Sequence, residues 1–164
     1  MLNNTKATLF ALMISVSFTT ANAAHPEHQD SRDKHSITIT EPWIRSAPIN
    51  APALGLFMDI SNNTNQDIKL VSIHVEGYQR VELHRTVDNN GLMKMIKQDF
   101  IPIAAQGDVH LKPGSWHAML IGPDKVPSKG EEVMISLKFN NGSAQSVFAL
   151  VRKGKMMMKH HSTH

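Results

Sequence analysis

The stretch that decides the fold is VELHRTVDNNGLMKMIK, residues 81–97. Apolar and polar side chains alternate on both sides of the turn sequence DNNG, a pattern typical of a β-hairpin. A turn centred on 89–90 would place His84 directly opposite Met95, whereas a turn centred on 90–91 would make the two residues diagonal neighbours on one face. Either register brings an imidazole and a thioether within reach of each other.

A second pair of the same side chains follows in SWHAMLI, residues 115–121. This segment comes after a Pro-Gly turn and alternates as a strand does, so His117 and Met119 leave the same face. The apolar residues between and beside them indicate a core-facing side. We therefore expect His117 and Met119 to point toward a partly open surface, where His84 and Met95 join them.

Two imidazoles and two thioethers form a neutral, soft donor set that suits Cu(I) better than Mg, Ca or Zn. Taken one at a time, such residues have ordinary explanations, because Met fills gaps in cores and a strand His is usually a surface or hydrogen-bonded residue. Met58 and Met134 lie in strand patterns and are expected to be packed, and Met93 shares a face with Met95 as a bystander. The joint pattern of all four donors favours a copper site at the surface between the hairpin and the second strand.

The spacing His84-x10-Met95-x21-His117-x-Met119 resembles the metal motif of the periplasmic copper chaperones called PCu(A)C. The similar neighbouring segments are Trp43-Ile44-Arg45, Val81-Glu82-Leu83-His84, Gly91-Leu92-Met93-Lys94-Met95 and Leu111-Lys112-Pro113-Gly114. The resemblance covers about residues 36–152 and is specific, because all four donors and both gaps match. One departure is Arg85-Thr86, where many members carry a further Met close behind the first His.

The resemblance implies an all-β, cupredoxin-like antiparallel Greek-key sandwich or barrel that binds one Cu(I). It also implies delivery of that ion to the dinuclear CuA centre of cytochrome c oxidase subunit II, alongside a Sco-type protein. The strand pattern independently indicates an antiparallel sandwich or barrel, because short alternating segments are separated by Asn, Gly, Pro and Asp clusters. These segments are 37–40, 54–60, 68–75, 81–86, 92–97, 108–112, 115–121, 133–139 and 146–151.

The two ends of the chain have compositions unlike the rest. Residues 1–23 contain one Lys, an apolar run and the small-residue site Ala-Asn-Ala, which predict a secretory signal peptide and export to the periplasm. The alternative is an N-terminal membrane anchor, but the run is shorter than the roughly 20 residues of a bilayer span. Cleavage would leave a His-rich flexible segment, residues 24–35, and a copper-binding domain, residues 36–152.

The C-terminal residues 153–164 are predicted to be a flexible tail rich in Met and His. Thioethers in such a tail favour Cu(I), and imidazoles also accept Cu(II). The candidate auxiliary ligands are Met156, Met157, Met158, His160, His161 and His164.

Charge and cysteine content exclude several functions. The formal charge is +3, and removing residues 1–23 takes away only Lys6 to leave +2, which is too small to suggest nucleic-acid binding. The chain has no Cys, which excludes disulfides, thiol redox chemistry and a blue-copper site.

Three function classes remain. The favoured one is a copper chaperone that is not an enzyme. The second is a periplasmic copper buffer, which would sequester metal at the site and the tails. The third is a copper enzyme or CopC-like protein with His25 as an N-terminal ligand, and an exposed strand face suits catalysis poorly because it offers no dry, shaped pocket.

Overall fold

The computed structural model describes residues 36–154, which form ten β-strands and no helix. The strands are β1 (Ile37–Arg45), β2 (Ala53–Asn62), β3 (Ile68–Val75), β4 (Tyr78–Asn89), β5 (Leu92–Gln98), β6 (Ile101–Ile103), β7 (Gly107–Leu111), β8 (Trp116–Pro123), β9 (Glu132–Phe139) and β10 (Ala144–Arg152). The predicted all-β class is therefore confirmed. Within 36–154, no helix has the length and apolar character that crossing a bilayer requires.

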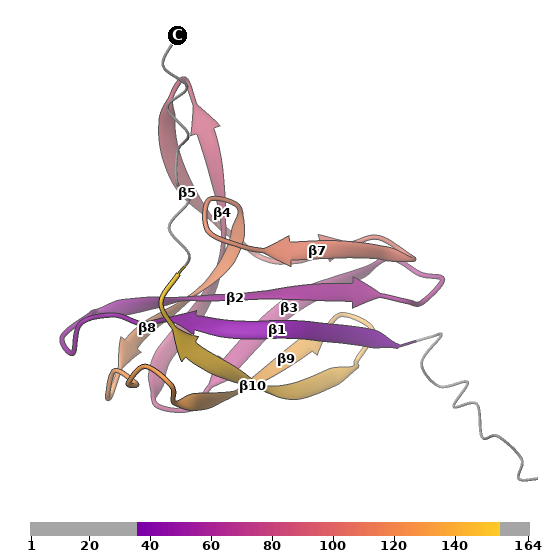
Figure 1. The fold of residues 1–164 in the computed structure, drawn as a ribbon. Coiled ribbons are helices and arrows are strands. Elements are labelled where there is room, and N and C mark those ends of the chain that lie inside the picture. Colours follow the sequence, from indigo (N-terminus) through magenta and orange to yellow (C-terminus); the bar gives the residue numbers. More distant parts are fainter. Residues whose placement is uncertain (1–35, 155–164) are drawn as a thin grey trace, which may run out of the picture. The chain divides into compact units, whose positions relative to one another are not determined.

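The strands form one hydrogen-bonded sheet in the order β5-β4-β8-β7-β2-β1-β10-β9-β3-β6, with β8 also bonded to β2 (Figure 1). β3 and β4 contact each other although they are far apart in this order, so the sheet curls around a shared core. Most neighbours are antiparallel, as expected, but β1 runs parallel to β10, and β7 pairs in parallel with β8. These two parallel pairings were not predicted from the strand pattern.

The core contains apolar side chains from strands along the whole order, including Leu56 on β2 and Ile135 on β9, each 0% exposed. On β8, Ala118 and Leu120 are also fully buried. The predicted core-facing side of β8 is therefore confirmed, and the alternate residues of that strand lie on the outer face.

The β4–β5 hairpin extends beyond the other strands (Figure 1). Its register places Thr86 opposite Met95 and His84 opposite Lys97. The turn falls at 90–91, where both residues have the positive φ angles, 56° and 82°, of a two-residue hairpin turn. Of the two registers that the sequence allowed, the diagonal one is observed.

β1 contains a bulge near its middle. Thr40 lies opposite Asp59 and Trp43 opposite Phe57, so one extra residue is accommodated in β1 at this point. Glu41 has the positive φ angle of 47° within the bulge. Because a bulge re-aims the side chains that follow it, Trp43 shares the outer face with Phe57 while the next residue enters the core.

Candidate metal site

The strands bring the four predicted donors to one region of the outer face. His84 on β4 and His117 on β8 are directly opposite each other, and their ring centroids are 5.7 Å apart. Met95 on β5 is diagonal to His84, and Met119 on β8 lies opposite Glu82. The predicted closeness of the two histidines is confirmed.

Three of these donors line one cavity of about 190 Å³. Its lining consists of Arg45, Gly55, Phe57, Thr86, Met95, Pro113, Gly114, His117 and Met119. The Met95 residue is 61% exposed, whereas His117 is only 5% exposed. His117 lies on the outer face as expected, but its side chain is buried, so the partly open surface expected there is open at Met95 and not at His117.

Hydrogen bonding fixes the tautomer of His117. Its Nδ1 lies 3.0 Å from the carbonyl oxygen of Ser115. A carbonyl can only accept, so Nδ1–H donates and Nε2 keeps its lone pair in the neutral ring. Burial lowers the pKa of His117, the neighbouring His84 lowers it further, and the bond to Ser115 opposes both effects. The neutral, metal-binding form of His117 is thereby favoured.

His84 presents the opposite nitrogen. Its Nε2 lies 3.0 Å from the Oε2 atom of Glu82, and a carboxylate can only accept, so Nε2–H donates. Its Nδ1 is buried and has no hydrogen-bond partner among the described residues. A buried lone pair without a partner is costly, and a bound cation would satisfy it. The two histidines thus offer a neutral donor nitrogen each, which fits a soft cation.

Glu82 holds the His84 ring in this orientation and accepts hydrogen bonds from three neighbouring side chains. Besides His84, it accepts hydrogen bonds from Arg80 Nε at 3.0 Å and Lys97 Nζ at 3.3 Å. The bonds from His84, Arg80 and Lys97 lower the pKa of Glu82 to about 2. Such a carboxylate behind a ligating histidine orients the ring and raises its basicity. The sequence analysis missed Glu82, although its position two residues before His84 on the same strand face was a usable signal.

An aromatic wall closes the other side of the cavity. Trp43 and Phe57 are stacked with centroids 4.5 Å apart, and the Phe57 ring is 6.4 Å from that of His117. A Cβ atom at Gly55 would lie 2.7 Å from the Phe57 ring, which is too close, so the observed position of that ring requires glycine at 55. The sequence analysis did not identify this wall, because it depends on the pairing of β1 with β2. Glycine inside a strand, which often marks a close approach, was the available signal.

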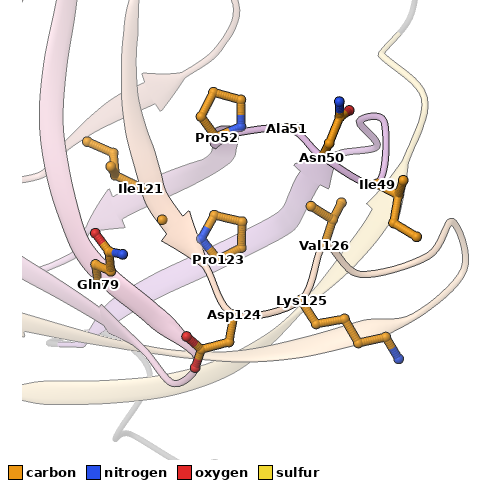
Figure 2. A pocket seen from close by; sticks show the side chains of 11 residues that line it. Ile49, Asn50, Ala51, Pro52, Gln79, Ile121, Pro123, Asp124, Lys125 and Val126 are labelled. Atoms are coloured by element: carbon orange, nitrogen blue, oxygen red, sulfur yellow. The ribbon is translucent and has the colours of Figure 1, made fainter.

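A second and larger cavity, about 440 Å³, lies at the other end of β8. Figure 2 shows Asn50 and Pro52 from the loop before β2 facing Pro123 at the end of β8 and Val126 just after it. No His or Met lines this cavity, so its donors do not suit a soft metal. The predicted signal peptide, the His-rich segment 24–35 and the auxiliary ligands 156–164 lie outside the described residues.

A family model described as "Putative lipoprotein LpqE-like" matches residues 37–151. The chain belongs to the LpqE-like family. Among curated proteins, it is 28% identical to the uncharacterized protein RP573 of Rickettsia prowazekii over 68% of this chain and 64% of that protein, so the match spans less than two thirds of the relative. It is 24% identical to the putative lipoprotein Lxx21020 of Leifsonia xyli, over 88% of this chain and 87% of that one.

Solved structures share the fold of this LpqE-like chain. The copper-bound PCuAC domain from PmoF2 aligns with a TM-score of 0.62 at 20% identity, over 72% of this chain and 93% of that domain. The CuI-DR1885 protein of Deinococcus radiodurans aligns with a TM-score of 0.54 at 27% identity, over 73% and 78%. The predicted resemblance to PCu(A)C proteins and the cupredoxin-like fold class are therefore confirmed.

Proposed function

We propose that this LpqE-like protein is an exported copper chaperone that carries one Cu(I) at the candidate metal site. Its ligands are His84, Met95, His117 and Met119. The protein delivers this Cu(I) to the CuA centre of cytochrome c oxidase subunit II, and a Sco-type protein takes part in the same delivery. Delivery takes place in the periplasm. The protein transfers its cargo and catalyses no reaction.

The observation that carries the proposal is the pair of opposed imidazoles, each with one nitrogen held by a hydrogen bond. Ser115 occupies Nδ1 of His117, and Glu82 occupies Nε2 of His84. The remaining nitrogens are the lone-pair donors, and that of His84 is buried without a partner. With two thioethers beside them, the donor set is neutral and soft, which suits Cu(I). The solved relatives whose names include copper or CuI support the same metal.

Differences in exposure support transfer as the role of the site. Met95 is 61% exposed on the edge strand β5, whereas His117 is 5% exposed. Cu(I) tolerates a change in the number of its soft ligands, so Met95 can yield to an incoming donor while His117 and Met119 retain the ion. Glu82 holds His84 in place during the exchange.

The second candidate function is periplasmic copper sequestration for copper tolerance. The composition of residues 156–164 favours it, because three Met and three His follow one another closely there. In that case the tail would hold additional Cu(I) through thioethers or Cu(II) through imidazoles. A buffer would bind more than one copper per chain and need no acceptor.

The test is a chelator-competition titration with Cu(I) under reducing conditions, repeated with Zn(II), on the mature chain and on a chain ending at Lys153. One tightly bound Cu(I) on the shorter chain, with much weaker Zn(II), is expected from the neutral donor set. Met119→Ala should weaken that binding, and Met93→Ala, an exposed methionine on the same strand face as Met95, serves as the matched control. Equal or tighter Zn(II) binding on the shorter chain would contradict the proposal.

A further inference from the structure

An exposed apolar and cationic surface continues from the metal site across the outer face of the sheet. Direct strand partners share a face, and the register links Phe57 to Trp43 and Trp43 to Leu150. It also links Phe148 to Met134. We call this surface the apolar–guanidinium face. Its members are Trp43, Arg45, Met134, Phe148, Leu150 and Arg152, and Glu132 lies opposite Leu150 on the same face.

The apolar members of this face are unusually exposed. Phe148 is 62% exposed, Met134 54% and Leu150 42%. The expectation that Met134 is packed was therefore wrong, because its strand position points it outward, opposite Phe148. Scattered single apolar residues on a surface are ordinary, but neighbouring ones on adjacent strands form a patch of the kind that marks an interaction site.

Two arginines border this patch on the side of the metal site. Arg45 and Arg152 are directly opposite each other on β1 and β10. The Arg152 guanidinium lies 4.4 Å from the Trp43 ring centroid, and that of Arg45 lies 5.6 Å from the Phe57 ring centroid. Neither guanidinium forms an ion pair with any residue of 36–154. Like charges at opposed strand positions are unfavourable, so an anionic partner would relieve them.

The aromatic stack connects these arginines to the proposed copper ligands. Trp43 stacks on Phe57, Phe57 adjoins His117, and Arg45 itself lines the metal-site cavity. A protein that covers the apolar–guanidinium face would therefore reach the mouth of the cavity, next to the exposed Met95.

We propose that the apolar–guanidinium face is the docking surface for the copper acceptor, a protein that presents carboxylates beside an apolar patch. The inference rests on the proposed function. The carboxylates pair with Arg45 and Arg152, and the apolar patch covers Phe148 and Leu150. Docking there brings the acceptor's metal ligands to the open side of the site.

Charge argues against two other occupants. A second copy of this chain would present the same face, which carries two arginines against one carboxylate, Glu132, so the two copies would meet with like net charge. The chain's own residues 155–164 carry Lys155 and Lys159 and no Asp or Glu, so they offer the arginines no acidic side chain. An acidic protein surface is the occupant that complements both features of the face.

The experiment measures Cu(I) transfer from the loaded mature chain to the apo soluble CuA domain of cytochrome c oxidase subunit II by stopped flow, at about 10 mM and about 150 mM salt. Arg152→Glu should lower the transfer rate constant about three- to tenfold at low salt and weaken its salt dependence, because charge steering is lost. Phe148→Ser should lower the rate at both salt concentrations. Neither variant should change the Cu(I) affinity measured by chelator competition.

The matched control is Lys69→Glu. Lys69 also lies over an aromatic ring, 4.2 Å from the centroid of Phe100, but it belongs to β3 near the opposite edge of the sheet. It should leave transfer unchanged. Equal transfer rates in the wild type, Arg152→Glu and Phe148→Ser would overturn the docking surface.

A wild-type chain that transfers no Cu(I) to the CuA domain would overturn the proposed delivery instead. NMR chemical-shift mapping with that domain and with a Sco-type protein then tests whether the apolar–guanidinium face is a docking surface. Shifts at Trp43, Phe148 and Leu150 with either protein would support it, and shifts confined elsewhere or no binding would overturn it. Self-association in analytical ultracentrifugation that Phe148→Ser abolishes would assign the face to a second copy, and so also overturn it.

Discussion

Replacing Glu82 by Ala tests whether a residue that does not touch the metal sets the affinity of the site. The substitution removes the acceptor that holds Nε2–H of His84, so the ring can rotate or change tautomer and Nδ1 is no longer preset as the donor. Loss of such an outer partner typically costs about 10- to 100-fold in metal affinity. That range corresponds to about 1.4 to 2.7 kcal/mol of binding free energy.

The assay is Cu(I) competition with a chromophoric chelator under reducing conditions. Glu82→Gln keeps an acceptor oxygen but loses the charge, so its affinity should fall between those of the wild type and Glu82→Ala. Glu76→Ala, which removes an exposed carboxylate from the turn after β3, is the matched control and should leave the affinity unchanged. NMR of the histidine ring nitrogens should show a single His84 tautomer in the apo wild type and a mixture in Glu82→Ala. Wild-type affinity in a folded Glu82→Ala protein would refute the reasoning.

Met119→Ala removes one of the proposed donors and should weaken Cu(I) binding by more than the 10- to 100-fold expected of an outer partner, and unchanged retention would exclude Met119 as a ligand. Deleting Met156 to His164 should lower the copper-to-protein ratio in mass spectrometry without abolishing the core site, and complete loss of copper would make the tail the functional element. Gly55→Ala should destabilise the protein by about 1–3 kcal/mol in denaturant unfolding, because its Cβ collides with Phe57; a neutral effect would show that the aromatic wall shifts easily.

The β4–β5 hairpin shows how much of the structure could be predicted from the local sequence. The turn sequence DNNG predicted two strands with His84 and Met95 on one face, and both features are observed. The sequence analysis left the register open, although Asn90-Gly91 is the preferred central pair of a two-residue hairpin turn and is the pair observed. Strand β6 was missed because it has only three residues with Pro102 at its centre. It occupies the last position of the sheet order, where proline is tolerated.

The supporting residues of the site depended on contacts between distant segments. Phe57 approaches His117 only because β2 lies beside β8, and Glu82 meets Lys97 only across the hairpin. Met134 was expected to be packed although Ser136 and Lys138, two and four residues further on, mark its face of the strand as the polar one. The donors themselves were identifiable because their chemistry is rare as a group, whereas their neighbours are residues that any sheet contains.

The bulge in β1 has a consequence for how this protein can change over time. Side chains along a strand obey an odd–even rule, and the extra residue at the bulge switches the parity of everything after it. Deleting Glu41 alone would remove the bulge and leave Trp43 opposite Phe57 and Ile44 opposite Leu56, so both residues would keep their faces. The bulge is therefore the place where β1 can lose one residue without exchanging the inside and the outside of the strand that joins the metal site to its neighbouring surface.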